Sequence, residues 1–337
     1  MSDAGKKLTV ADLAKEVGVS PATISRVLNH SHLVNKDTYD KVMEAIDRLG
    51  YEIPEQRDFQ LRKRNDSNIV AVNLSSFSDI DCAEYMNGIQ TSSYRYGWTP
   101  VLTQDPLNVH TIDAYLRTLQ NMRAAGVILL NHVQTEILDQ LTAELPVVQC
   151  GEYNENASLP YVGIDDQSAT RMAVSHLISR GARKIVFVNG PSRFHYAQVR
   201  RRGFEQALRN AGIELDPSCI VSLSEANFAM AHTFISPMLT FQDHPDAIFA
   251  ANDTSAYAAI VAAKEQGLRV PEDICVIGFG NQEFSIMSVP KITTVSQPRF
   301  QLGFIACELL HEQWANQAMP TQNIILNTEL IIRGSTK

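Results

Sequence analysis

The chain has 337 residues, of which 45% are hydrophobic, and its formal net charge is −8 at pH 7. This length allows two or three compact units. The hydrophobic content is enough to form buried cores, which excludes an intrinsically disordered chain. The polar N-terminus excludes a typical secretory signal, and no apolar run is long enough to span a membrane, so we expect a cytoplasmic protein with no membrane partner.

Residues 9–29 predict two short helices separated by a tight turn. Thr9 and Ser20 are the expected N-caps, because their hydroxyls can accept from backbone N–H groups of the first turn. Pro21 suits the first position of the second helix, and Gly18 suits the end of the first. The spacing therefore predicts a helix-turn-helix, a device for reading DNA.

A third helix is predicted between the cap Asn35 and Gly50, with Val42, Ile46 and Leu49 at helical spacing. This helix supplies the three-helix core that so small a domain needs.

The second helix places Arg26 on the part of a recognition helix that meets base edges. The planar guanidinium group of arginine can donate twice to guanine. The alternative is an ordinary solvated helix arginine, and the sequence leaves both interpretations open.

The segment from Leu8 to Tyr51, with its G-V-S-P-A-T-I-S-R-V-L-N core and R-L-G-Y ending, resembles the headpiece of the lactose/galactose repressor family. The resemblance implies a double-stranded operator DNA partner, and it implies a homodimer because one headpiece gives little affinity. It also implies contacts to phosphates or bases from Thr9, Ser20, Ser25 and Asn29, and base reading by Val10, Pro21, Ala22 and Arg26.

The charge is distributed unevenly. Residues 1–66 hold 11 basic and 11 acidic side chains, so the remainder of the chain carries the whole negative excess. DNA-binding units are usually basic. Local placement of basic groups must therefore supply the attraction, such as Arg26, Lys6, Lys7 and the basic run at residues 62–64. That run is equally consistent with a solvated linker.

Residues 52–66 are polar and read as a linker. The family resemblance implies a short hinge helix here, with a leucine that wedges into the minor groove. Leu61 lies at the matching distance, and the alternative is an exposed linker leucine. Asp58 stands where the family prefers a small apolar residue, so whether the hinge helix forms stays open.

From residue 69 onward, short apolar runs alternate with helical patterns; the runs are I-V-A-V-N-L, V-I-L-L, V-V-Q-C, K-I-V-F-V, A-I-F-A-A and C-V-I-G-F. This alternation predicts an α/β body with parallel sheets and helices on both faces. Pieces such as V-G-I-D-D, R-R-R-G-F and E-L-I-I-R-G-S-T also match the family in order and spacing.

The resemblance implies a two-lobed body like that of periplasmic binding proteins, crossed three times by the chain, with a small effector in the cleft. The expected divisions are a headpiece at 1–51, a linker at 52–66 and a body at 67–337, with one lobe at about 67–164 and 296–322 and the other at about 165–295 and 323–337.

Arg200 is the first candidate for the effector site, because it matches a family arginine that donates to sugar hydroxyls, a carboxylate or a purine. The alternative is that Arg200, which belongs to a run of three arginines, lies on a solvent-exposed helix face. Asn252 matches a family position at the cleft end of a strand, with a helix cap as the alternative. Tyr196 is favoured over its neighbour His195 as a stacking or hydroxyl contact.

Two further effector-site positions depart from the family pattern. Gly280 stands where the family commonly has an aspartate that holds two sugar hydroxyls, and Cys82 stands where it often has an aromatic residue. Together with Arg200, this favours an acidic sugar such as an aldonate. A nucleoside stays open, because the Q-P-R and I-I-R-G-S-T segments also resemble the cytidine repressor. The subgroup of the family, gluconate-type or cytidine-repressor-like, is therefore left open.

The sequence thus predicts a transcriptional regulator, a repressor by preference, that is switched by a sugar, a sugar acid or a nucleoside. A transport-type binding protein is the second interpretation. An enzyme is the third, because the chain has no G-x-S-x-G or phosphate-cradling motif and the Asp165–Asp166 pair reads as a strand-end turn. The five cysteines are scattered, and we expect no cofactor and no metal site.

Overall fold

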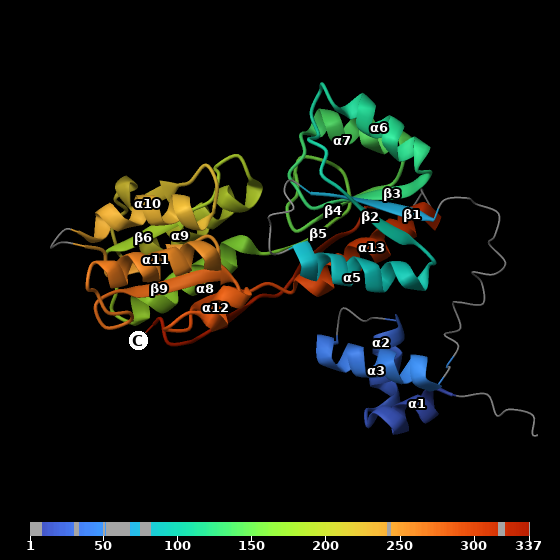
Figure 1. Ribbon diagram of the computed structural model, residues 1–337, viewed down its shortest axis with the longest axis horizontal. Coiled ribbons are helices and arrows are strands. Elements are labelled where there is room, and N and C mark those ends of the chain that lie inside the picture. The colour runs from blue at the N-terminus through green and yellow to red at the C-terminus, as the bar shows by residue number, and fades with distance from the viewer. Residues whose placement is uncertain are drawn as a thin grey trace, which may run out of the picture.

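The computed structural model describes residues 9–29, 34–49, 51, 68–74, 82–240, 244–315 and 321–336. The whole linker at residues 52–66, including Leu61, lies outside this range. A small helical headpiece lies beside a body of two α/β lobes (Figure 1).

The headpiece contains the three predicted helices, α1 (Val10–Val17), α2 (Pro21–Asn29) and α3 (Lys36–Leu49). Their predicted caps are confirmed. Thr9 forms a capping box with Asp12, and Gly18 ends α1 in the left-handed conformation at φ 74°. Ser20 Oγ accepts from Thr23 N at 3.1 Å, and Asn35 Oδ1 accepts from Thr38 N at 2.8 Å. Local capping chemistry therefore fixes where each of these helices begins.

Apolar side chains from all three helices form the headpiece core, among them Leu13, Ile24, Val27, Val42 and Ile46.

The headpiece core continues into the first lobe through Tyr39 of α3. Its ring lies 5.7 Å from the ring centroids of Phe300 and Phe304, which belong to helix α13 (Arg299–Ala315). Offset and edge-to-face pairs of this kind contribute about 0.5–1.5 kcal/mol beyond their buried area. The headpiece thus contacts the body through α3, and the outer surface of α2 stays exposed to solvent.

The first lobe contains a parallel sheet in the order β11-β5-β4-β3-β1-β2. Its strands are β1 (Ile69–Asn73), β2 (Thr99–Thr103), β3 (Ala124–Leu129), β4 (Val147–Cys150), β5 (Tyr161–Ile164) and β11 (Asn323–Leu326). Helices α6 (Ile112–Asn121) and α7 (Thr135–Glu144) pack on one face of the sheet, and α5 (Cys82–Arg95) and α13 pack on the other.

The second lobe repeats this plan in the order β12-β10-β9-β8-β6-β7. Its strands are β6 (Ile185–Asn189), β7 (Ile220–Ser222), β8 (Ala247–Ala250), β9 (Cys275–Gly280), β10 (Thr293–Ser296) and β12 (Glu329–Ile331). Helices α8 (Asp166–Ser179) and α9 (His195–Asn210) cover one face, and α10 (Phe228–Leu239) and α11 (Asp253–Glu265) cover the other. The short η2 (Pro217–Cys219) and α12 (Glu283–Met287) complete this lobe.

All strand pairs are parallel except β10 with β12, so the predicted α/β fold class is confirmed.

The chain passes between the lobes three times: after β5, after β10 and after β11 (Figure 1). The last passage differs from the expectation. Residues 323–326 were expected in the second lobe, but β11 pairs with β5 in the first sheet. Ile324 and Leu326 pack against the core there, which places this passage after Leu326.

Helices α5 and α13 approach so closely that glycine is required at the contact. A Cβ atom at Gly303 would meet the backbone oxygen of Tyr85, and one at Gly88 would meet the backbone of Phe300. In both cases the Cβ atom would meet backbone atoms, which cannot move away as the end of a flexible side chain can.

We therefore expect Gly303→Ala to lower the free energy of unfolding by about 1–3 kcal/mol, the usual cost of overpacking. Chemical denaturation would measure this. Helix propensity alone favours alanine over glycine, so a stabilised variant would contradict the close approach.

Candidate functional site

The outer surface of α2 is open to solvent. Ser20, Pro21, Ala22 and Arg26 are exposed there. Thr9 at the start of α1 is also exposed, and Val10 is half-buried. The side chains of Ser25 and Asn29 and the whole of Leu61 lie outside the described residues. The exposed set forms one end of the headpiece, where a guanidinium and several small groups can approach a nucleic acid surface.

A cavity of about 790 Å³ lies between the two lobes, and this volume is typical of a site for a small molecule. Residues at the carboxyl ends of β4, β5, β6, β8 and β9 contribute to its walls, together with the start of α9. Parallel sheets bind ligands at this edge. Its charged lining residues are Glu152, Asp166, Arg193, Arg200, Glu225 and Arg299.

Arg200 is buried in the wall of this cavity, with 5% of its surface exposed. Its Nε donates to Asp166 Oδ1 at 2.6 Å, and its Nη1 donates to the carbonyl oxygen of Ala251 at 2.7 Å. Burial raises the pKa of the Asp166 carboxyl, and the Arg200 guanidinium opposes that rise. The alternative of a solvated helix face is therefore wrong for Arg200.

Two aromatic rings hold the guanidinium group of Arg200 in place. Its Cζ lies 3.5 Å from the centroid of the Phe279 ring and 4.8 Å from that of Tyr196. A buried guanidinium fixed by a carboxylate, a carbonyl and two rings is preorganised, so Arg200 is held in one position in the cavity wall.

Of the five predicted effector-site residues, Tyr196, Arg200 and Asn252 line the cavity. Asn252 also serves as the helix cap that was its alternative, because its Oδ1 accepts from Ser255 N and its Nδ2 donates to the Ala226 carbonyl. Cys82, at the start of α5, is not among the lining residues. Gly280 lines a smaller neighbouring hollow of about 340 Å³.

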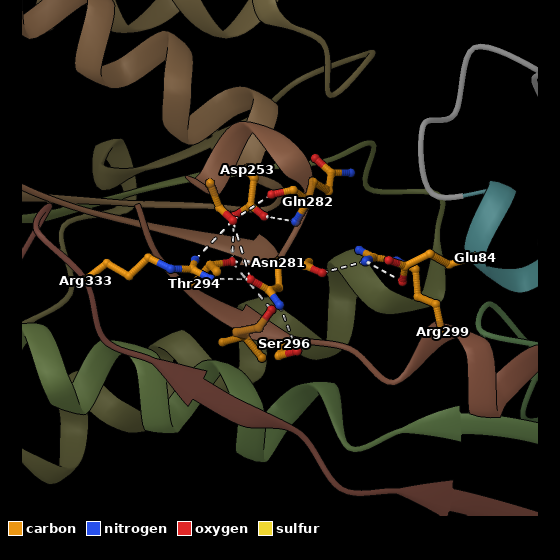
Figure 2. Close-up of polar contacts among 11 residues, drawn as sticks. Glu84, Asp253, Asn281, Gln282, Thr294, Ser296, Arg299 and Arg333 are labelled. Atoms are coloured by element: carbon orange, nitrogen blue, oxygen red, sulfur yellow. Dashed lines mark hydrogen bonds and ion pairs between the residues drawn. The ribbon is translucent and has the colours of Figure 1, made fainter. Parts of the chain in front are cut away.

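Gly280 leaves room for Arg299. A Cβ atom at Gly280 would lie 2.5 Å from Arg299 Nη2, and the φ of Gly280 is 126°, which a residue with a side chain rarely adopts. Arg299 Nη1 donates to the carbonyl oxygen of Gly280, and it lies 3.8 Å from Glu84 of α5 (Figure 2). Arg299 thus links the first lobe to the end of β9 in the second.

A polar network behind this link makes the second-lobe side rigid (Figure 2). The buried Asp253 accepts from Gln282 N at 2.6 Å and from Thr294 Oγ1 at 2.5 Å. Arg333 donates to Asn281 Oδ1 at 2.6 Å. These bonds fix the turn after β9, so Asp253 acts as a buried structural acceptor.

Sequence reasoning missed five of the six charged lining residues of the cavity: Glu152, Asp166, Arg193, Glu225 and Arg299. Glu152 and Asp166 come within two residues of the end of a buried strand, β4 and β5 respectively, and that position was the available signal. Arg299 was noted only as part of a Q-P-R segment. No feature of the sequence near Arg299 predicts that its side chain contacts Gly280.

Within the described ranges, no three His, Cys, Asp or Glu side chains gather in a way that could hold a metal ion. Among the helices of these ranges, none is both long enough and apolar enough to cross a membrane.

Comparison with known proteins assigns both parts of the chain. Residues 9–54 match the family described as bacterial regulatory proteins, lacI family, and residues 174–336 match the periplasmic binding protein-like domain. The HTH-type transcriptional repressor CytR of Escherichia coli K12 is 30% identical over 332 residues, which cover 98% of this chain and 96% of CytR.

Two solved structures are similar over nearly the whole chain. The complex of the transcriptional regulator CelR with cellobiose has a TM-score of 0.73 at 26% identity, covering 97% of this chain and 99% of CelR. The lac repressor dimer bound to operator and the anti-inducer ONPF has a TM-score of 0.72 at 26% identity, covering 98% and 99%.

Proposed function

Because the chain belongs to the lacI family of bacterial regulatory proteins, we propose that it represses transcription and that a small metabolite in the inter-lobe cavity sets its affinity for operator DNA. The observation that carries this proposal is the presence on one chain of an exposed, capped α2 and a cavity of about 790 Å³ between two lobes. We propose a cytoplasmic location as well, because the proposed partner is operator DNA.

The expected working unit is a homodimer, as in the lac repressor dimer on its operator. Two headpieces then read two half-sites, and the DNA fixes the distance between them. A ligand that binds one arrangement of the lobes better than another shifts the population toward it. That shift moves the headpieces into or out of register with the half-sites.

For the ligand we propose a sugar or a sugar acid. The cavity combines aromatic rings from Tyr85 and Tyr196 with the amides of Asn227 and Asn252, a combination suited to a ring that carries hydroxyl groups. Cellobiose occupies the similar CelR. Arg193 lines the cavity and forms no ion pair with any residue the structure describes. Its positive charge favours a ligand with a carboxylate.

The test is a thermal-shift panel of aldoses, the matching aldonates such as glucose with gluconate, and nucleosides. Each hit would then be added to a fluorescence-anisotropy titration of operator DNA. We expect an aldonate to stabilise the protein more than its aldose does and to change its DNA affinity. A nucleoside hit without any sugar hit would overturn the sugar assignment.

Arg193→Gln provides the specificity test. We expect this variant to lose the preference for the aldonate and to keep the binding of the neutral sugar. The matched control is Arg209→Gln, which removes an exposed arginine from the far end of α9. If both variants kept the preference, the carboxylate assignment to Arg193 would be wrong.

We also propose that the protein releases the bound metabolite chemically unchanged and is not an enzyme. The buried carboxylate of Asp166 is engaged by Arg200, and that of Glu152 accepts backbone bonds from α9, so neither carboxylate is free of protein contacts. Chromatography of a hit incubated with excess protein would reveal any turnover.

A further inference from the structure

Helix α9 carries Tyr196 and Arg200 into the effector cavity, but it lacks a cap of its own. Its N-cap residue is Phe194, which has no side chain able to accept a hydrogen bond, and no cap bond from it is present. The first N–H groups of a helix need partners, and burying them without any is costly. The partners of this helix must therefore come from elsewhere.

Glu152 supplies them from the other lobe. It follows β4 of the first lobe, and its carboxylate accepts from the backbone N–H of His195 at 2.5 Å and of Tyr196 at 3.3 Å. The Glu152 side chain is only 10% exposed. These bonds span the gap between the lobes, so any separation of the lobes here must break them.

We propose that Glu152 is a positioning residue and the closing latch of the cleft: it caps α9 across the gap between the lobes and thereby holds Tyr196 and Arg200 at the effector. The effect on effector binding rests on the proposed function of the cavity. The latch itself does not, because it forms between two segments of the protein.

The latch also couples closure of the cleft to protonation. Burial raises the pKa of Glu152 from 4.5 to about 7, although the two backbone N–H groups lower it. In an open cleft the exposed carboxyl returns toward its ordinary value. The closed form therefore takes up a proton that the open form does not hold, and closure is favoured below pH 7 and weakened as the pH rises through 7.

Other charged groups face Glu152 from each neighbouring element. His132 Nδ1, from the loop after β3, lies 3.7 Å from its Oε1. Asp166 of α8 and Arg200 of α9 act on it with opposite signs, and they stay paired within the second lobe. Burial lowers the pKa of the His195 side chain, so protonation of His195 opposes closure at low pH. Protonation of Glu152 favours closure, whereas protonation of His195 opposes it. If closure increases on acidification, the increase is therefore in the direction expected for Glu152 and not for His195.

The test follows the two capped N–H groups directly by hydrogen–deuterium exchange of the full-length protein without ligand. The measured quantity is the protection factor of the segment 194–199, corrected for the intrinsic pH dependence of exchange. We expect it to rise about tenfold from pH 8 to pH 6 in the wild-type protein, as a pKa near 7 in the closed form requires.

Glu152→Gln keeps an acceptor but cannot titrate, so its protection should be high and equal at both pH values. Glu152→Ala removes the acceptor, and its protection should fall about fivefold at pH 6, the order of effect of losing a helix cap. Glu155→Gln is the matched control, because it removes an exposed carboxylate from the same loop, and it should behave as the wild type does.

Two results would overturn the latch. Protection unchanged in Glu152→Ala would mean that the cap is not made in solution. If Glu152→Gln retained the wild-type pH dependence, that dependence would belong to a group other than Glu152. Neither readout involves DNA or effector, so failure of the latch and failure of the proposed regulatory function are separate results.

Discussion

Replacing Arg200 with alanine is expected to abolish effector binding and to destabilise the second lobe by about 3–5 kcal/mol, because the buried Asp166 carboxylate loses the arginine that pairs with it. Asp166 lies 2.6 Å from the Arg200 Nε and has 5% of its surface exposed. Denaturant unfolding followed by far-ultraviolet circular dichroism would measure the loss of stability.

A double variant separates the effect on stability from the effect on effector binding. Asp166→Asn combined with Arg200→Met removes both charges and keeps much of the volume, so the lobe should recover most of its stability. Effector binding, measured by calorimetry with a hit from the ligand panel, should stay absent. A double variant that binds the effector as the wild type does would show that Arg200 does not contact it.

Arg26→Ala is expected to remove sequence-specific DNA binding while binding to random DNA persists. A bidentate arginine–guanine contact contributes about 1–3 kcal/mol of discrimination, and a dimer would lose it at both half-sites. Arg26 is exposed on α2, so its removal should leave the headpiece folded. Binding sites selected from random DNA by the wild-type protein would supply the operator for anisotropy titrations.

Lys41→Ala is the control for this experiment, because Lys41 is an exposed cation on α3 of the same headpiece. It removes the same charge and should leave the ratio of specific to random binding unchanged. The salt dependence of random binding should persist in both variants. If Arg26→Ala kept the wild-type ratio, α2 would not read bases through this residue.

The strands of the body show how far sequence reasoning extends. The six apolar runs correspond to β1, β3, β4, β6, β8 and β9, because strands inside a parallel sheet are buried on both faces. The other six strands, β2, β5, β7, β10, β11 and β12, were not among the predicted runs. β2 contains a proline and is partly exposed, and β7 has only three residues, so neither has a continuous apolar run.

The caps of the headpiece helices and the six strands with continuous apolar runs were determined by the sequence itself, because each depends on residues a few positions apart. The charged contacts of the cleft were decided only by the tertiary structure. Arg200 donates a hydrogen bond to Asp166, and Arg299 donates one to the carbonyl oxygen of Gly280. Glu152 accepts one from the backbone at the start of α9. These partners come from different elements and, for Glu152 and Arg299, from different lobes. Hydrophobic periodicity fixes which face of an element is buried, but it carries no information on which distant polar group a buried charge will meet.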